Sequence, residues 1–380
     1  MGGCEDRRFV VTESWGTEVL VVGAGPAGLA TSIELARRGR RVLLAERSLS
    51  NRRKLCGEFL SGDGCQVLKE LGGELTDDCP RIDGVLLTGM RGRGWQTSIP
   101  GLGRGCSRQR LGLILASVCD DLGVKRLRGV RVEPGSGLNI TARRGTVPVE
   151  IEARMTVHAS GRAGSARLRP SKGRRGRRQW LAVAVHGRGR RSTQVQLHAT
   201  GTGYVGVNGI EGDRINVCAL LRAPGTAVDP LQILMSESTH NPLLHNYLSS
   251  ITFDDTSVCT VAGLDFGRQS PPRSITVGDA AGAPTPLLGL GLAAALRGGQ
   301  MLGKMADDAM QTTTTTSELS ARYQRAWRAE FGRRFALGRH LQRLIMQPLL
   351  AEIVLLGLHQ FPRLGERVVR ATRGPLPVVS

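Results

Sequence analysis

Residues 18–46, EVLVVGAGPAGLATSIELARRGRRVLLAE, decide the fold. After Glu18, residues 19–22 form a continuous apolar run, which is typical of a strand that a parallel sheet buries on both faces. LATSIELARR then places apolar residues at helical spacing, Gly39 ends that helix, and RVLLAE forms a second strand. The stretch therefore predicts a Rossmann-like strand–turn–helix–strand unit in a mixed α/β protein.

The turn of this unit holds a G-x-G-x-x-G pattern at Gly23, Gly25 and Gly28, with Pro26 and Ala27 between the last two. Gly23 permits the tight turn, Gly25 lets the backbone approach a pyrophosphate, and Gly28 brings the helix close to the strand. The N-terminus of the helix then offers N–H groups and a partial positive charge to phosphates. The turn therefore predicts a dinucleotide site.

The residue that ends the second strand is acidic. Glu46 can accept hydrogen bonds from both ribose hydroxyls of an adenosine, and it would repel a 2′-phosphate. NADP is therefore disfavoured at this site. The pattern does not by itself separate FAD from NAD.

A second motif, TVGDAAGAPTPLLGLGLAAALRGG at residues 276–299, decides between these cofactors. Together with the first motif it resembles the FAD oxidoreductases that share the para-hydroxybenzoate hydroxylase fold. The resemblance implies that Asp279 holds a ribityl hydroxyl and that the turn from Pro286 to Gly291 lies against the isoalloxazine. A helix N-terminus after this turn would also stabilise the negative charge of reduced flavin.

Three shorter stretches resemble geranylgeranyl-reductase-like flavoproteins within this superfamily: KLCGEFLS (54–61), SRQRL (107–111) and GYVGVNGIEGDRINVCALL (203–221). The resemblance implies a Cys-Gly pair near the flavin and an Arg108 that reaches its phosphates. Two positions depart from the family pattern, since Gly112 and Ser160 stand where Asp is usual. The electron donor therefore stays open between NAD(P)H and an electron-carrier protein.

The candidate site follows from these motifs. Cys56 and Tyr204 are the candidate catalytic residues, with structural roles as the alternative. The residues expected to bind FAD are Gly23, Gly25, Pro26, Ala27, Gly28, Glu46, Arg47, Cys56, Gly57, Arg108, Gly278, Asp279, Pro286, Gly289 and Gly291.

Several other polar residues are weighed against ordinary structural roles. Arg52, Arg53 and Lys54 would favour the thiolate of Cys56. Glu58 is an acid that could act beside the flavin, although a solvated side chain is the simpler interpretation. The seven His show no metal spacing and no matched acid, so we assign them no role and expect no metal site.

The dinucleotide unit is expected to be discontinuous, with a β-rich substrate domain threaded between its pieces. The expected boundaries are a flexible leader at 1–16, an FAD-binding domain at 17–80, 105–165 and 268–310, a substrate domain at 81–104 and 166–267, and a C-terminal helical region at 311–380. The apolar stretch Leu341 to Leu358 contains Arg343, Pro348 and Glu352, so we expect a packed or surface-lying helix there.

The formal net charge is +20, yet the basic residues are spread along the chain and are not interleaved with aromatics. We therefore expect no nucleic-acid partner. The eight Cys form no C-x-x-C pair and the N-terminus has no apolar signal region, which together favour the cytoplasm. Peripheral contact with the inner membrane face stays open.

The sequence thus predicts an FAD-dependent oxidoreductase that exchanges hydride with an apolar substrate, either isoprenoid-like or aromatic and polyketide-like. A flavin monooxygenase or halogenase that uses O₂ is the alternative, although the W-x-W-x-I-P signature of flavin halogenases is absent. A third alternative is a non-enzymatic flavin-binding or membrane-surface protein.

Overall fold

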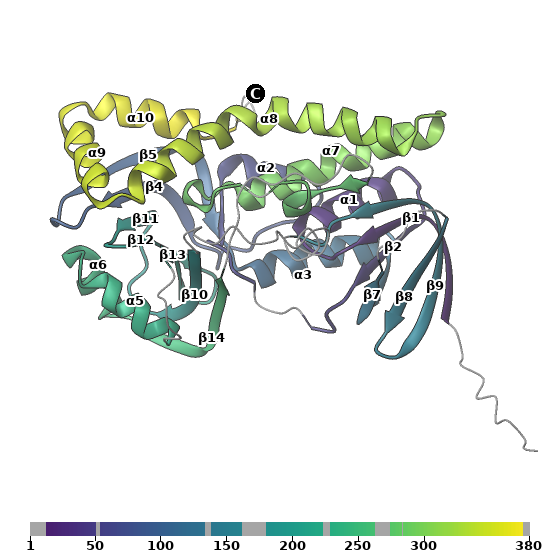
Figure 1. Ribbon diagram of the computed structural model, residues 1–380, viewed down its shortest axis with the longest axis horizontal. Helices are drawn as coiled ribbons and strands as arrows, with labels where there is room; N and C mark the ends of the chain where they lie inside the picture. Colours follow the sequence, from purple (N-terminus) through teal and green to yellow (C-terminus); the bar gives the residue numbers. More distant parts are fainter. Residues whose placement is uncertain are drawn as a thin grey trace, which may run out of the picture.

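The computed structural model describes residues 13–50, 54–133, 138–161, 180–222, 229–262, 274–282 and 284–374. Two sheets lie side by side beneath a layer of helices, and the long helix α8 (Thr316–Ile345) runs over both (Figure 1). The fold is the expected mixed α/β arrangement with a helical C-terminus. The site lies between the two sheets.

The first sheet has seven strands in the order β6-β2-β1-β9-β8-β7, with β15 also paired to β9. Its parallel part joins β6, β2, β1, β9 and β15, and the hairpin β7–β8–β9 is antiparallel. The strands are β1 (Glu13–Val22), β2 (Val42–Glu46), β6 (Lys125–Arg128), β7 (Val130–Val132), β8 (Asn139–Arg144), β9 (Val147–His158) and β15 (Ile275–Thr276). Because β1 begins at Glu13, residues 13–16 are strand and not leader, and residues 1–12 lie outside the described residues.

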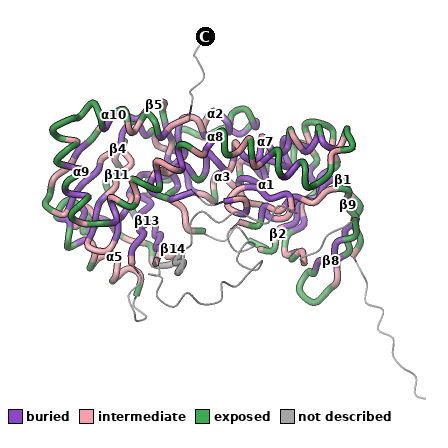
Figure 2. Tube along the Cα trace, turned by 45° about the horizontal axis from the view of Figure 1, so that its top comes forward, coloured by how far each residue is buried: buried purple, intermediate pink, exposed green. Residues whose placement is uncertain are grey.

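Helices α1 (Pro26–Arg37), α3 (Arg108–Asp121) and α7 (Gly291–Gln311) cover this sheet, with α2 (Gly62–Glu70) against α7. Helices α1 and α7 approach closely because α7 has glycines at the contact. A Cβ on Gly299 would stand 2.5 Å from the carbonyl oxygen of Ala27. Most residues of α1 are buried in this layer, and buried residues recur along α7 (Figure 2).

The second sheet has eight strands in the order β14-β10-β13-β12-β11-β4-β5-β3. Neighbouring strands in this sheet are antiparallel, except that β11 pairs with β4 in parallel. The strands are β3 (Phe59–Leu60), β4 (Arg81–Thr88), β5 (Gly94–Gly105), β10 (Trp180–Arg188), β11 (Gln194–Ala199), β12 (Gly203–Ile210), β13 (Arg214–Arg222) and β14 (Thr252–Ala262). Strand β3 therefore lies in the second sheet, although its residues fall in a stretch expected to belong to the FAD-binding domain.

Side chains alternate between the two faces of this sheet, as successive strand residues must. Val183 and Val205 pack under α5 (Pro230–Ser238) and α6 (Pro242–Leu248), and α6 is not predicted from the sequence. Ala182 and Tyr204 face the other way, toward Leu287 and the C-terminal helices. This second face forms one wall of the site.

The C-terminal region contains three helices, α8, α9 (Pro348–Gln360) and α10 (Pro362–Ala371). The expectation of one helix over 341–358 is wrong, because α8 ends at Ile345 and Pro348 starts a new helix. Among the described residues no single helix is long and apolar enough to cross a membrane. Helices α8 and α9 together have the length and apolar composition of a span, but they are bent by 112° at the break between them.

Candidate active site

The glycine turn after β1 is tight for steric reasons. Gly23 has φ +112°, and a Cβ there would lie 2.5 Å from the carbonyl oxygen of Ala159. A Cβ on Gly28 would lie 2.0 Å from the carbonyl oxygen of Gly23. Helix α1 then starts without a side-chain cap, with Gly25 in the N-cap position. Its first N–H groups are therefore available to an anion.

Glu46 is held in place by the same turn. Its Oε2 accepts a hydrogen bond from Ala24 N–H at 2.9 Å, and its Oε1 accepts one from Ser48 N–H at 3.0 Å. Burial works to raise the pKa of Glu46, but the two backbone bonds and the charge of Lys54 leave that pKa below its ordinary value. The carboxylate is thus a fixed anion at the end of β2.

A polar pocket opens beside Glu46 and the N-terminus of α1. Its lining includes Arg108, which the sequence motifs predict to bind the flavin phosphates. Lys54 also lines it, although the sequence analysis relates that residue only to Cys56. The guanidinium of Arg108 lies 3.3 Å from the point where a Gly25 Cβ would stand. Burial and the charge of Arg108 lower the pKa of Lys54. This pocket suits a polyanion next to a ribose.

An apolar pocket lies on the other side of Gly25, Pro26, Glu58 and Arg108, which line both pockets. Its walls are the second glycine turn, the segment at 55–59 and the inner face of the second sheet. Residues that contribute to these walls are Leu55, Cys56, Gly57, Val85, Ala182, Val195, Leu197, Tyr204, Leu220, Gly278, Asp279, Pro286, Leu287, Gly289 and Gly291. Helix α7 begins at Gly291 in this wall without a side-chain cap.

The structure brings most of the expected residues to these two pockets. The expected residues that line one or both pockets are Gly25, Pro26, Ala27, Glu46, Cys56, Gly57, Arg108, Tyr204, Gly278, Asp279, Pro286, Gly289 and Gly291. Gly23 and Gly28 line neither pocket, but their close backbone contacts set the form of the turn. Arg47 is exposed and lines neither pocket, so it stands apart from the rest of the expected site.

The expectation of a thiolate at Cys56 is corrected. Burial raises the pKa of Cys56, although Arg108 opposes this shift, so the thiol form is favoured. Its Sγ accepts a hydrogen bond from Glu58 N–H at 3.3 Å. Arg52 and Arg53, which were expected to stabilise the thiolate, lie outside the described residues.

Glu58 is not a solvated side chain, because only 3% of it is exposed. Its backbone has φ +52°, a region that non-glycine residues rarely adopt. Its Oε1 accepts from Arg108 N–H at 3.1 Å, and its Oε2 lies 2.6 Å from His186 Nε2. The Arg108 bond fixes the carboxyl at the N-terminus of α3, where both pockets meet.

His186 extends this contact toward the polar pocket. It is buried on β10, and its Nδ1 lies 3.5 Å from Arg214 Nη1. Arg214 in turn donates to Glu211 at 2.7 Å. His186 therefore has a matched acid after all, which no sequence spacing could reveal because its partner lies 128 residues away.

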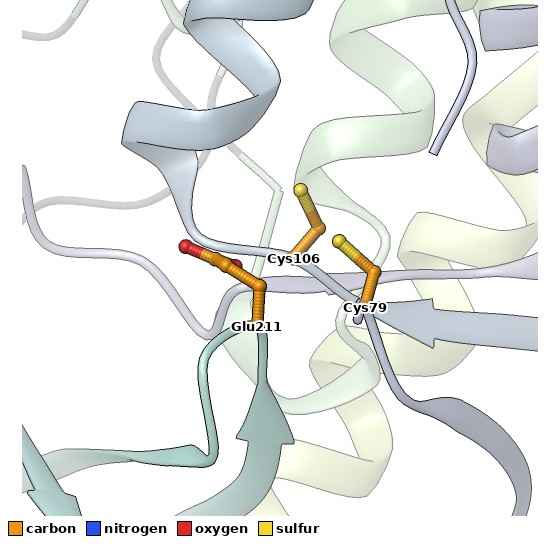
Figure 3. Close-up of side chains that lie close together, drawn as sticks. All are labelled: Cys79, Cys106 and Glu211. Atoms are coloured by element: carbon orange, nitrogen blue, oxygen red, sulfur yellow. The ribbon is translucent and has the colours of Figure 1, made fainter. Parts of the chain in front are cut away.

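Cys79, Cys106 and Glu211 form a separate buried group, and their ligand atoms all lie within 4.8 Å of one another (Figure 3). These are residue types that can hold a metal ion. However, Glu211 already accepts hydrogen bonds from Ser107 N–H at 2.8 Å and from Arg214. Hydrogen bonding to Cys79 and burial raise the pKa of Cys106. We interpret the group as structural, because its hydrogen bonds connect the start of α3 to the turn after β12.

Comparison with known proteins identifies the first part of the chain. Residues 16–76 match the model of an FAD binding domain. The menaquinone reductase of Mycobacterium tuberculosis is 25% identical over 358 residues, which cover 87% of this chain and 84% of that protein. Squalene epoxidase 5 of Arabidopsis thaliana is 41% identical over 78 residues, which cover 20% of this chain and 15% of that protein.

Two solved structures share the fold over nearly the whole chain. A geranylgeranyl bacteriochlorophyll reductase-like protein from Thermoplasma acidophilum has a TM-score of 0.74 at 17% identity, covering 97% of this chain and 94% of the other. A flavin-dependent brominase has a TM-score of 0.77 at 18% identity, covering 94% of this chain and 93% of the other.

The residues of the site fit FAD. The polar pocket offers the bare N-terminus of α1 and a fixed carboxylate, which suit the phosphates and the ribose of ADP. The adjoining apolar pocket, with its second glycine turn, suits a flat ring system. The cofactor of this protein is therefore FAD.

Proposed function

Because this chain carries an FAD-binding domain within the fold of flavin-dependent oxidoreductases, we propose that it is an FAD-dependent reductase of an apolar substrate. The observation that carries the proposal is the apolar pocket between the second glycine turn and the second sheet. An isoprenoid-like or an aromatic, polyketide-like molecule matches that lining. Similarity to a menaquinone reductase along most of the chain favours reduction over oxygenation.

When bound, FAD supplies the hydride chemistry, and the residues of the chain position the reactants. Glu46 would hold the adenosine ribose, Arg108 the phosphates, and Asp279 the ribityl chain. Cys56 and Tyr204 line the apolar pocket and would contact the substrate. Cys56 would act as a neutral thiol, since burial raises its pKa.

Reduction of a carbon–carbon or quinone double bond needs protons as well as hydride. Glu58 is the carboxyl that lines both pockets, and His186 joins it to the polar side. We assign the proton to the pair formed by Glu58 Oε2 and His186 Nε2. Arg214, which is about one third exposed, contacts His186 on the polar side, and the pair would be recharged from solvent on that side.

An oxygenase is the second candidate, and two observations favour it. Squalene epoxidase 5 is similar over 20% of this chain, and the brominase shares the fold over 94% of it. The electron donor in either case would be NAD(P)H or an electron-carrier protein.

Anaerobic turnover separates the two candidates. The purified holoprotein is reduced with NADH, NADPH or dithionite in parallel and is then mixed with a menaquinone analogue without O₂. We expect reoxidation of the flavin with formation of the reduced substrate. Product that forms only in air and carries ¹⁸O from ¹⁸O₂ would establish the oxygenase instead.

A further inference from the structure

Helix α9 has apolar residues on two opposite faces. Ala351 and Leu355 are buried, at 3% and 0% exposure, and both belong to the cluster that lies against the second sheet. Leu349, Ile353 and Leu356 are 74%, 61% and 47% exposed. Residues at i, i+4 and i+7 share one side of a helix, so the second face is an apolar stripe turned away from the protein.

This stripe continues past the end of α9. Phe361 and Leu364, at the start of α10, are 64% and 57% exposed. Leu350, on α9, is 39% exposed. Among the described residues, six of the twelve exposed large hydrophobic side chains thus fall within residues 349–364. Figures 1 and 2 place α9 and α10 at one end of the molecule, and exposed residues alternate with buried ones along α9. We call these six residues the α9 face: Leu349, Leu350, Ile353, Leu356, Phe361 and Leu364.

The elements on either side of the α9 face are basic. Arg343 precedes α9, and Arg363, Arg367 and Arg370 follow it on α10, all of them exposed. Glu366 is exposed as well, but Glu352 is buried and accepts from Arg91 N–H at 3.0 Å. Two copies meeting through this face would bring their arginines together. An anionic surface would instead be attracted.

The dimensions of α9 exclude a membrane span by this helix alone. Its 13 residues rise about 20 Å, whereas a bilayer core is about 30 Å thick. Its inner face is also committed to the second sheet, and the bend of 112° separates it from α8. A helix of this kind lies in the plane of the interface.

We propose that the α9 face seats this protein on an anionic lipid bilayer, with the six apolar side chains inserted and the arginines at the headgroups. The face is linked to the apolar pocket by packing. Trp95 contacts Gly365 of α10, and Arg373 lines the pocket while donating to the Leu288 carbonyl at 3.1 Å. An apolar substrate dissolved in the bilayer would thus be near its pocket, but seating itself does not depend on the proposed reaction.

Vesicle co-sedimentation of the full-length holoprotein tests the proposal. Vesicles of phosphatidylcholine alone are compared with vesicles that contain phosphatidylglycerol, at low and high salt. The variant Leu349→Glu/Ile353→Glu changes the α9 face, and Leu243→Glu, an exposed leucine on α6, is the matched control. The flavin spectrum and the melting temperature report whether each variant is folded.

We expect the protein to bind anionic vesicles and to lose about tenfold in affinity in high salt or on neutral vesicles. The double variant should lose at least about tenfold on anionic vesicles, whereas Leu243→Glu should bind as the wild type does. Equal binding by the double variant would overturn the proposal. It would also be overturned by a concentration-dependent dimer, seen without lipid, that the double variant abolishes.

Discussion

Glu58 Oε2 and His186 Nε2 lie 2.6 Å apart in the interior, although 128 residues separate them in the chain. Glu58 comes from the segment after β2, and His186 comes from β10 of the second sheet. Glu58 directly precedes β3 of that same sheet, and the pair lies at the point where the polar and apolar pockets meet. A contact that only the assembled fold creates is a sensitive place to test the proposed chemistry.

Replacing Glu58 with Gln removes the acidic proton but keeps the shape of the side chain. We expect the reduced flavin to be reoxidised by substrate about 10²-fold more slowly, which is the usual range for loss of a general acid. Rapid-mixing absorbance under anaerobic conditions measures this step directly. FAD content and the rate of flavin reduction by the donor should stay at wild-type levels.

His186→Gln is the companion variant for this prediction. If His186 recharges Glu58, His186→Gln should slow steady-state turnover and change how the turnover rate depends on pH. The rate of a single reoxidation event should stay closer to that of the wild type. Unchanged reoxidation in Glu58→Gln, together with an unchanged pH profile in His186→Gln, would reduce the pair to a structural link.

Glu46 offers a test of the ADP half of the site. Glu46→Arg places a cation where the carboxylate accepts from Ala24 and Ser48, so we expect purified protein with little or no bound FAD. The ratio of flavin to protein absorbance measures this outcome. A full complement of FAD in the variant would refute the role assigned to Glu46.

The lowered pKa of Glu46 also gives a pH dependence. A carboxyl whose folded-state pKa lies below its unfolded value contributes stability above the unfolded pKa and loses it as the pH falls through the folded pKa. The difference in melting temperature between wild type and Glu46→Gln should therefore be constant at neutral pH and shrink in acid. A difference that grows as the pH falls would contradict this sign.

Cys56 should react slowly with alkylating reagents. Burial raises its pKa, and the thiolate is the reactive form, so at pH 8 its modification should lag behind that of an unperturbed cysteine. Peptide-level mass spectrometry after timed iodoacetamide treatment measures the rate. Faster modification of Cys56 than of a free cysteine peptide would restore the thiolate interpretation.

The local parts of the site can be predicted from the sequence, because the spacing of Gly23, Gly25 and Gly28 fixes a turn within six residues. The same holds for the acid that ends β2, since strand length sets its place. By contrast, the Glu58–His186 pair and the group of Cys79, Cys106 and Glu211 arise from segments far apart in the chain. No periodicity encodes such contacts.

The errors in the elements also have physical causes. Helix α6 has only seven residues, too few for a helical period to stand out from its surroundings. The apolar stretch at 341–358 suggests one helix, but Pro348 lacks the N–H that would continue it and instead starts α9. Strand β3 has two residues and is defined only by its pairing with β5.

The turn at Gly28 allows a last prediction, about stability and cofactor binding together. In Gly28→Ala the new Cβ would meet the Gly23 carbonyl oxygen at 2.0 Å and the Ala159 Cβ at 3.0 Å, so the turn must open. We expect a loss of about 3 kcal/mol or more in unfolding free energy, together with loss of FAD. Gly16→Ala is the matched control, because nothing lies within 4 Å of its Cβ position. Chemical denaturation of the two variants measures the difference, and equal stabilities would show that the close approach at Gly28 is relieved without cost.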